Sequence, residues 1–196
     1  MRISKKAGLM FIHIPKNAGR SIWVAMESKY PDTKKLAKEH ALLSEAWKPR
    51  FKKLKTFAVI RNPWDRMVSL YHFQSQFKKT CETKRYGVVS GDQITEAGFK
   101  KWLLKYGKIS CGHELTKVQQ IDWLTLNGKI AINKIVRFEN LREDLLGATG
   151  LELGGDRKHE SKHVHYSEYY DDETRDFVAK RFNHDIIEWG YGFNVE

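Results

Sequence analysis

Two short apolar segments, each leading through a polar turn into a helix-like stretch, constrain the fold of this chain most strongly. The first is LMFIHI at residues 9–14, followed by PKNAGRS and a helix expected to begin near Ser21. The second is TFAVI at 56–60, followed by RNPWDRMVSLYHF, in which Pro63 suits the first position of a helix. Strands that alternate with helices in this way are typical of α/β proteins.

The rest of the chain continues this alternation. We expect helices around 36–47, 96–106 and 117–126, a strand at 133–138 with a helix after it, and a last helix from Asp171 to Trp189 that ends at Gly190. Residues 79–95 lack periodicity and are interpreted as a surface excursion. We therefore predict an α/β fold, a P-loop-like three-layer sandwich with a central, mainly parallel sheet flanked by helices. The length favours a single domain over residues 1–196.

The charge of the chain favours polyanionic partners. It has 35 Lys and Arg against 24 Asp and Glu, a formal net charge of +11, which suits nucleic acid, an acidic membrane, an anionic glycan or a multiply phosphorylated cofactor. The run KPRFKKLK at 48–55 fits a solvated face as well as a binding patch. No apolar stretch approaches the roughly 18 residues of a membrane span, and the N-terminal apolar run is too short for a secretory signal. We expect a soluble, cytoplasmic protein.

The first turn has the features of an anion site. Its expected ligands are the backbone N–H groups of the loop, the start of the following helix, a lysine charge and a hydroxyl. The residues concerned are Lys16, Asn17, Ala18, Gly19, Arg20 and Ser21. Gly19 allows close approach or a positive φ angle. An ordinary turn explains this motif equally well when it is taken alone.

The second turn strengthens the interpretation. Arg61 ends a strand and supplies a planar donor fork, while Ser69 lies about two helical turns into the next helix and supplies a hydroxyl. Because ligands bind beyond the carboxyl ends of parallel strands, both turns are expected at one edge of the sheet. Two such sites fit a ligand with two separated anionic groups.

Four ordered blocks resemble a known family. HIPKNAGRSI resembles the 5'-phosphosulfate loop of the sulfotransferases that use 3'-phosphoadenosine 5'-phosphosulfate (PAPS), and FAVIRNPWDRMVSLYHF resembles the 3'-phosphate motif of their carbohydrate-modifying branch. RFENLREDL and HYSEYYDDETRDFVAKRFNHDIIEWGYGF are similar to the distal part of this Golgi-type, heparan 2-O-like branch. The resemblance excludes about residues 79–110, where we expect contacts with the acceptor.

The resemblance implies roles for the residues of both turns. Lys16 would contact the oxygen that bridges phosphate and sulfate, residues 17–21 would hold the 5'-phosphate, and Arg61 and Ser69 would hold the 3'-phosphate. Asn17 and Arg20 stand where the branch commonly has threonine. Arg20 would then either add charge near the sulfuryl group or point into the acceptor groove.

A loop over the cofactor is implied further along the chain. Ser161 and Lys162 are candidates for it, because the corresponding segment of the family is basic and rich in hydroxyls. The neighbouring histidines His159, His163 and His165 lack the partners of a metal site, and we expect no metal.

The reaction implied is in-line transfer of a sulfuryl group from PAPS to a carbohydrate hydroxyl, with 3'-phosphoadenosine 5'-phosphate (PAP) as product. Related carbohydrate sulfotransferases have a histidine between the two motifs, so we choose His40 as the base; an exposed helix histidine is the alternative. His13 is expected to pack within its strand. The basic stretch FKKTCETKRY would favour an anionic glycan as acceptor.

Other interpretations have less support. A divergent P-loop kinase needs a hydroxyl residue directly after Lys16, where this chain has Asn17. A nucleic-acid-binding module is favoured by net charge alone, and we expect no nucleic acid partner. Cys81 and Cys111 can form at most one disulfide and are expected to be free thiols. Since eukaryotic relatives are usually anchored in the Golgi, a trimmed lumenal domain is the alternative to a cytoplasmic protein.

Overall fold

The computed structural model describes residues 1–37, 40–75, 95–106, 118–154 and 164–193. Contacts between residues divide the chain into two compact units. The first unit consists of Met1–Arg61 and Gln120–Lys158, and the second of Asn62–Gln119 and His159–Glu196. The single domain expected over residues 1–196 stays a prediction.

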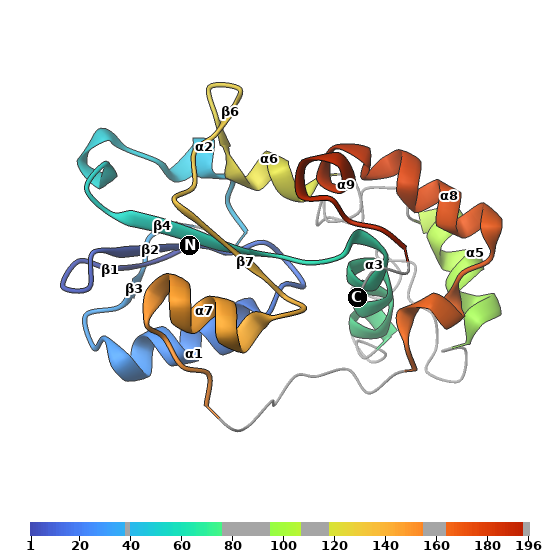
Figure 1. The fold of residues 1–196 in the computed structure, drawn as a ribbon, viewed down its shortest axis with the longest axis horizontal. Coiled ribbons are helices and arrows are strands. Elements are labelled where there is room, and N and C mark those ends of the chain that lie inside the picture. The colour runs from blue at the N-terminus through green and yellow to red at the C-terminus, as the bar shows by residue number, and fades with distance from the viewer. Residues whose placement is uncertain (38–39, 76–94, 107–117, 155–163, 194–196) are drawn as a thin grey trace, which may run out of the picture. The chain divides into compact units, whose positions relative to one another are not determined.

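A five-stranded sheet forms the centre of the first unit (Figure 1). Its strands are β1 (Arg2–Ser4), β2 (Leu9–Ile12), β3 (Lys34–Lys35), β4 (Lys55–Ile60) and β7 (Lys134–Arg137), in the spatial order β3-β1-β2-β4-β7. The pairs β2–β4 and β4–β7 are parallel, as the alternation of strands and helices predicted. The carboxyl ends of β2 and β4 therefore point to the same edge, where the two turns begin.

The prediction of a mainly parallel sheet was wrong, because the sheet is mixed. β1 pairs antiparallel with β2 and with β3. A tight turn joins β1 to β2: the N–H of Gly8 donates to the carbonyl of Lys5 at 3.2 Å, and Gly8 has a φ of 65°. A hairpin this short forces the antiparallel direction. Neither β1 nor β3 has the apolar length by which a strand is recognised in a sequence.

Helices cover both faces of this sheet (Figure 1). On one face lie α1 (Gly19–Lys29) and α7 (Leu141–Thr149), and on the other lie α2 (Leu43–Ala46) and α6 (Gln120–Leu124). A short helix η1 (Pro49–Phe51) precedes β4, and a hairpin of β5 (Thr125–Leu126) and β6 (Lys129–Ile130) follows α6. The layered α/β arrangement agrees with the prediction.

The first unit has its core between the sheet, α1 and α7. Buried residues from all three contribute to it: Leu9, Phe11, Ile22, Met26, Phe57, Val59, Val136, Leu145 and Leu151. Phe11 and Phe57 stack with their ring centres 5.1 Å apart. Packing of α1 against β2 and β4 fixes the loop that joins β2 to α1, which is the first of the two turns.

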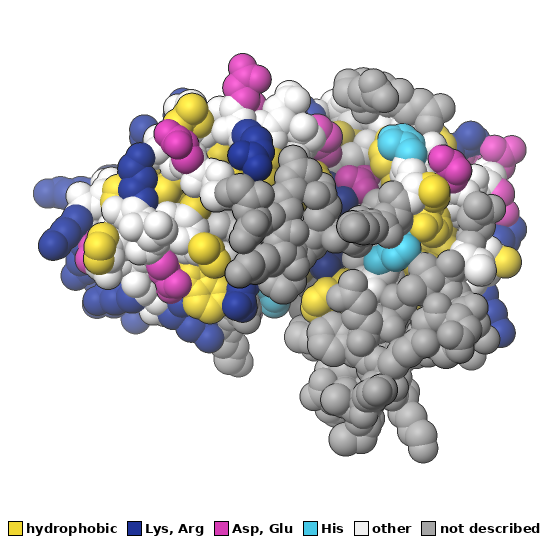
Figure 2. Space-filling model, turned by 90° about the horizontal axis from the view of Figure 1, so that it is seen from below, with side chains coloured by type: hydrophobic (Ala, Val, Ile, Leu, Met, Phe, Trp, Pro, Cys, Tyr) yellow, Lys and Arg dark blue, Asp and Glu magenta, His cyan; other side chains and the backbone are white. Residues whose placement is uncertain are grey.

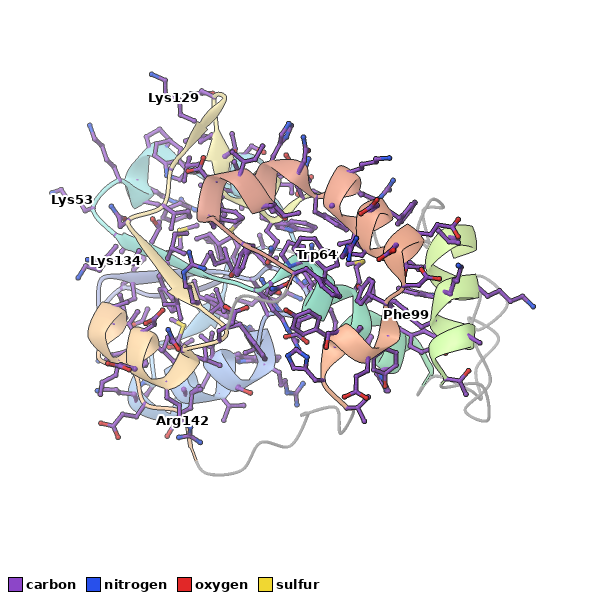
Figure 3. The ribbon with its side chains drawn as sticks, turned by 45° about the vertical axis from the view of Figure 1, so that its right-hand side comes forward. Lys53, Trp64, Phe99, Lys129, Lys134 and Arg142 are labelled. Carbon is purple, nitrogen blue, oxygen red and sulfur yellow. The ribbon has the colours of Figure 1, made fainter. Side chains whose placement is uncertain are left out.

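All the regular elements in the described residues of the second unit are helices. Its elements are α3 (Pro63–Ser75), α5 (Glu96–Tyr106), η4 (Tyr166–Tyr169), α8 (Asp172–Arg181) and α9 (Asn183–Trp189). Aromatic rings form its core. Phe99 on α5 (Figure 3) lies 5.4 Å from Tyr71, 5.6 Å from Tyr169 and 5.0 Å from Tyr170, measured between ring centres. Pro63 opens α3, as predicted.

Several predicted helices have different bounds. Within the described residues of the range 36–47, where we expected a helix, only Leu43–Ala46 is helical. The last helix is two helices, since Phe182 leaves the helical conformation with φ −115° and ψ 30°. Gly190 ends α9 with a φ of 63°, as expected. Most of the 79–95 excursion lies outside the described residues.

Candidate functional site

The loop between β2 and α1 holds two ordinary residues in the left-handed region of backbone space. Lys16 has a φ of 69° and Ala18 a φ of 55°. For residues with a side chain, each such conformation costs about 1–3 kcal/mol and persists only where the surroundings fix it. Ala18 precedes α1 and makes no side-chain cap, so the first N–H groups of the helix are left for another acceptor. The loop has the backbone geometry of an anion site.

Asn17 fastens this loop to its neighbours. Its side chain is 1% exposed, and Nδ2 donates to the carbonyl of Val59 at 2.7 Å and to Oε1 of Gln120 at 2.6 Å. Within the described residues, Oδ1 is buried and accepts no hydrogen bond. Asn17 thus has a structural reason to stand where the family branch commonly has threonine: its side-chain amide is longer than a threonine hydroxyl group and reaches β4 and α6. Only the backbone N–H of Asn17 is left to serve an anion.

Gln120, the first residue of α6, is a site residue that the sequence did not indicate. It is fully buried. Its Oε1 accepts from the backbone N–H of Arg61 at 3.0 Å, and its Nε2 donates to the carbonyl of Arg61 at 2.8 Å. A single amide therefore holds both polar backbone groups of Arg61 and the side chain of Asn17. In the sequence it is one glutamine of an unremarkable polar pair, so no local signal could have identified it.

Arg61 joins the second turn to the first. Its Nη1 donates to the carbonyl oxygen of Lys16 at 3.1 Å, and its Cζ lies 3.9 Å from the ring centre of Phe138. Only 7% of the residue is exposed. The contact with Phe138 fixes the plane of the guanidinium group, which is the property that makes arginine a specific ligand for phosphate.

The side chain of Lys16 has an unusually low pKa for a lysine. Burial, together with the nearby positive charge of Arg61, lowers the pKa of Lys16 from 10.5 to about 7. A bound anion between these two groups would offset both causes and restore the proton. The pair is therefore suited to an anionic ligand that binds together with a proton.

Gly19 is required by a close approach and not by a positive φ angle. A Cβ atom at this position would lie 1.7 Å from Nε2 of His13. His13 stacks on Phe11, with ring centres 5.7 Å apart, and forms one wall of the loop. Burial, followed by the charge of His40, lowers the pKa of His13 to about 3. His13 is therefore neutral in ordinary conditions and does more than pack within its strand.

His40 lies next to His13. The two ring centres are 4.6 Å apart, with an angle of 57° between the planes. His40 is half-buried and occupies a turn, so the alternative of an exposed helix histidine does not apply. Its carbonyl oxygen accepts a hydrogen bond from Nε1 of Trp123 at 3.2 Å. The residue chosen as base thus belongs to the same unit as Lys16 and Arg61.

Arg20 and Ser21 lie on the first turn of α1, and both are exposed. The guanidinium carbon of Arg20 lies 5.1 Å from the ring centre of Trp23, and that of Arg2 lies 3.5 Å from the same ring. Arg20 therefore turns along the helix towards Trp23 and Arg2. The two roles that the sequence left open for Arg20 stay predictions.

The remaining predicted residues fall elsewhere. Ser69 is buried on α3 in the second unit. The neighbouring Arg66 is also buried, and its Cζ lies 6.0 Å from the ring centre of Phe182. Outside the described residues lie Ser161, Lys162, Cys81 and Cys111.

The described part of the chain has no group of His, Cys, Asp or Glu side chains that could hold a metal ion. It also has no helix of the length and hydropathy needed to cross a bilayer.

Comparison with known proteins identifies the family. The model of the sulfotransferase family matches residues 1–192, which is nearly the whole chain. Comparisons with curated proteins and with solved structures found no match. The matched segment includes every residue of the two turns, so the loop at Lys16 and the strand end at Arg61 lie within it. The chain belongs to the sulfotransferase family.

Proposed function

We propose that this protein transfers the sulfuryl group of PAPS to a hydroxyl group of a carbohydrate or glycan. The observation that supports this most is the hydrogen bond between Arg61 and the Lys16 carbonyl, at 3.1 Å, which ties the two turns into one cationic site. Membership in the sulfotransferase family supports sulfuryl transfer in general. PAPS has anionic groups at both ends of its ribose, and two joined turns suit such a molecule.

The loop would hold the 5'-phosphate end of PAPS. Residues 16–21 present backbone N–H groups and the start of α1, and Gly19 leaves no side chain between the loop and His13. Asn17 keeps the loop in its strained form before any ligand arrives. Such preorganisation lowers the entropy cost of binding and directs the donors towards the ligand.

Arg61 would hold the 3'-phosphate. Stacking on Phe138 and the contact with the Lys16 carbonyl restrict the guanidinium to one orientation. Gln120 fixes the backbone from which this side chain extends. The part of Ser69 in binding the same phosphate rests on the resemblance of the α3 segment to the family motif, as do those of Ser161 and Lys162.

Lys16 would stabilise the leaving group. PAPS supplies the sulfuryl group when bound, and negative charge grows on the oxygen that remains with the phosphate. A protonated Lys16 beside that oxygen favours the transition state more than the ground state, which is the requirement for catalysis. The lowered pKa of the free protein means that Lys16 gains its proton as the anion binds.

His40 would accept the proton of the acceptor hydroxyl. The neutral ring of His13 at 4.6 Å adds no positive charge that would discourage protonation of His40. Proton removal by a positioned base contributes about 10²–10⁴-fold to such reactions. No metal ion is needed for this scheme, because the cations of the chain offset the charge of the phosphates.

The kinase alternative loses its remaining support at Asn17. That side chain, in the place of a magnesium-binding hydroxyl, is held by Val59 and Gln120. Net charge is the only observation that favours a nucleic acid partner. Cytoplasmic localisation stays a prediction from the sequence.

Thermal unfolding with added nucleotides tests the proposal. PAP should raise the unfolding midpoint, because a ligand that binds only the folded state stabilises it. ATP with magnesium serves as the control, since it has the same base and phosphate groups at the 5' end but no 3'-phosphate. Stabilisation by ATP with magnesium and none by PAP would contradict the proposal.

A further inference from the structure

The amino ends of the parallel strands form the edge of the first unit that lies away from the two turns. β4 begins at Lys55 and β7 at Lys134, and because these strands are parallel, both lysines lie at this edge. The N–H of Lys55 donates to the carbonyl of Gly8 at 2.7 Å, which brings the turn between β1 and β2 to the same edge. Arg61 follows the other end of β4, about 20 Å from Lys55 at the usual rise of a strand. The edge is therefore separate from the proposed transfer site.

Exposed lysines gather at this edge. They come from three segments that contain no Asp or Glu, residues 1–8, 48–55 and 127–137. We call them the lysine edge, and its members are Lys5, Lys6, Lys52, Lys53, Lys55, Lys129 and Lys134. Figure 2 shows Lys and Arg side chains gathered at the end of the first unit that carries the turn between β1 and β2. Figure 3 shows Lys53 and Lys134 towards this end, with Lys129 on the hairpin of β5 and β6.

Carboxylates of the described residues do not offset this charge. Among these residues, no member of the lysine edge forms an ion pair. Asp32 lies beside the turn between β1 and β2, but its carboxylate accepts hydrogen bonds from Oγ of Ser4 at 2.6 Å and from the backbone N–H of Lys6 at 2.9 Å. Asp32 thus fastens the turn that carries two of the lysines. A group of like charges held in this way creates a positive field that attracts an anionic partner.

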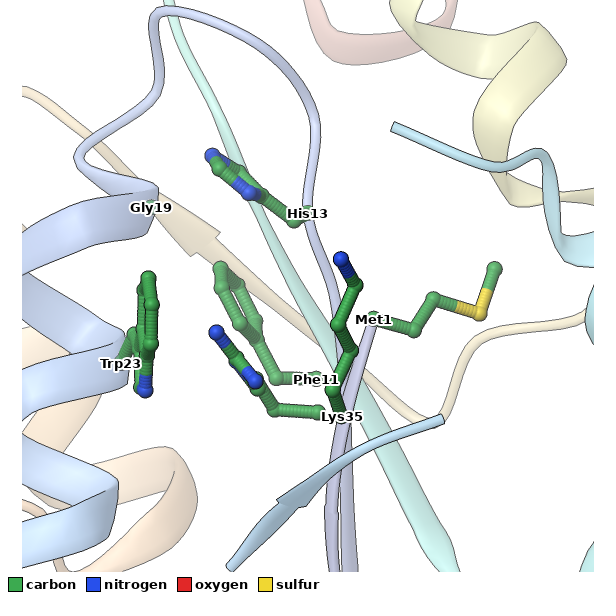
Figure 4. Close-up of a pocket in the computed structure, with 7 residues that line it drawn as sticks. Met1, Phe11, His13, Gly19, Trp23 and Lys35 are labelled. Atoms are coloured by element: carbon green, nitrogen blue, oxygen red, sulfur yellow. The ribbon is translucent and has the colours of Figure 1, made fainter. Parts of the chain in front are cut away.

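The chemistry of the lysine edge fits a broad negative surface. Its charges are ammonium groups on flexible stems, which act as point charges and lack the planar fork with which arginine binds a single phosphate or carboxylate. The pocket at the start of α1 (Figure 4) is lined by other residues, among them Phe11, His13 and Lys35, and by no member of the lysine edge. The lysines therefore stand on the surface of the unit, where many separate anionic groups can reach them at once.

The hairpin of β5 and β6 adds an exposed apolar residue. Ile130 is 37% exposed and directly follows Lys129. Asn127 and Gly128 have φ angles of 52° and 74°, as in the tight two-residue turns of hairpins, and the hairpin projects from the layers of the unit (Figure 1). Ile130 lies four residues before Lys134, a span of at most about 14 Å. A soluble polyanion has no apolar partner for this isoleucine, whereas the interfacial region of a bilayer has one.

We propose that the lysine edge and the hairpin of β5 and β6 dock this protein on an anionic phospholipid surface. The ammonium groups lie among the lipid headgroups, and Ile130 enters the boundary with the acyl chains. Each lysine near such a surface strengthens binding about fivefold, so a group of lysines with one apolar residue suffices for reversible docking. Because the carboxyl ends of β2 and β4 point the other way, docking leaves the phosphate loop accessible. The inference does not depend on the proposed function.

Sedimentation of the full chain with lipid vesicles tests this inference. The probes are vesicles of phosphatidylcholine with about a third phosphatidylserine, vesicles of phosphatidylcholine alone, and inorganic polyphosphate as a soluble polyanion. The edge variant carries Lys53→Gln and Lys134→Gln. Its matched control carries Lys101→Gln and Lys180→Gln, which remove the same charge from exposed lysines on α5 and α8. A third variant, Ile130→Gln, removes the apolar contact without a change of charge.

The wild type should bind the anionic vesicles at least about a hundredfold more tightly than the neutral ones. The edge variant should bind the anionic vesicles about 25-fold more weakly, and the matched control should lose less than about threefold. Ile130→Gln should weaken vesicle binding about threefold or more and leave polyphosphate binding unchanged. Equal losses in the edge variant and the matched control would overturn the inference. So would vesicle binding that Ile130→Gln does not weaken, which would indicate general attraction to polyanions.

Chemical labelling of amines in the wild type gives a second test that requires no variant. Anionic vesicles should protect Lys53 and Lys134 from acetylation and leave Lys101 and Lys180 reactive. Equal protection of the four lysines, or protection of none, would overturn the inference. PAP binding is measured on the same proteins and should be equal in the wild type and the edge variant. Its absence in the wild type would count against the proposed function alone.

Discussion

The guanidinium group of Arg61, at the end of β4, donates a hydrogen bond to the carbonyl oxygen of Lys16, in the loop after β2, at 3.1 Å. The contact joins the two turns that the sequence singled out separately. It also brings a permanent cation next to a lysine whose pKa is lowered to about 7. The predictions below follow from this arrangement.

Replacing Arg61 by lysine should weaken PAP binding by about tenfold or more. Lysine keeps the positive charge but loses the planar fork and the stacking on Phe138. Isothermal titration with PAP measures the change, and urea unfolding of the same variant separates lost affinity from lost stability. Unchanged PAP affinity in a folded Arg61→Lys variant would mean that Arg61 only braces the loop.

PAP binding should take up protons at about pH 8. In the free protein Lys16, with a pKa of about 7, has largely lost its proton there, and a bound phosphate restores it. Affinity should accordingly fall as the pH rises through and above about 7. Titrations in two buffers of different ionisation enthalpy report the uptake directly, and Lys16→Met should abolish it. Binding of PAP at this pH without proton uptake would contradict the lowered pKa.

The same shift affects the stability of the free protein. Between about pH 7 and pH 10.5 the unfolded chain keeps the Lys16 proton while the folded chain has lost it. The free energy of unfolding should therefore rise with pH across this window through the contribution of Lys16. Urea unfolding of wild type and Lys16→Met across the window isolates that contribution, which the variant should lack.

Gly19→Ala should disrupt the loop. The new Cβ would lie 1.7 Å from Nε2 of His13, so the start of α1 or the histidine must shift. We expect loss of PAP binding and a lower unfolding midpoint. Gly147→Ala on α7 is the matched control, because nothing lies within 4 Å of its Cβ; it should raise stability by up to about 1 kcal/mol. Restored PAP binding in the double variant His13→Ala, Gly19→Ala would attribute the defect to this clash.

Gln120→Ala should loosen both turns at once. It leaves the backbone N–H and carbonyl of Arg61 and the amide of Asn17 without their buried partner. The free energy of unfolding should fall by about 2 kcal/mol or more. If Gln120 positions Arg61, the KM for PAPS should rise while the KM for the acceptor stays constant. A variant that is less stable but has an unchanged KM for PAPS would show a purely structural role.

The sequence predicted those parts of the fold whose signals are local. The strands β2 and β4 are apolar runs of sufficient length, and Pro63 and Gly190 occupy positions that their own geometry favours. β1 and β3 could not be predicted, because three and two residues of mixed character become strands only through pairing.

The same distinction holds at the candidate site. Lys16 and Arg61 follow strands in recognisable motifs, so both could be identified from the sequence as candidate site residues. Gln120 and His13 were missed because their roles depend on contacts with Arg61 and Gly19, which come from distant or different elements of the chain. Such contacts leave no period or spacing in a sequence.

The central claim is that the joined turns hold PAPS for transfer to a glycan hydroxyl, with His40 as the base. Incubation of the wild type and His40→Ala with sulfur-labelled PAPS and a panel of neutral and uronate-containing glycans tests it most directly. The account predicts label in a glycan with the wild type, and at least about a hundredfold slower labelling by His40→Ala at unchanged PAP affinity. Failure of the wild type to label any glycan, or equal labelling by both proteins, would contradict it.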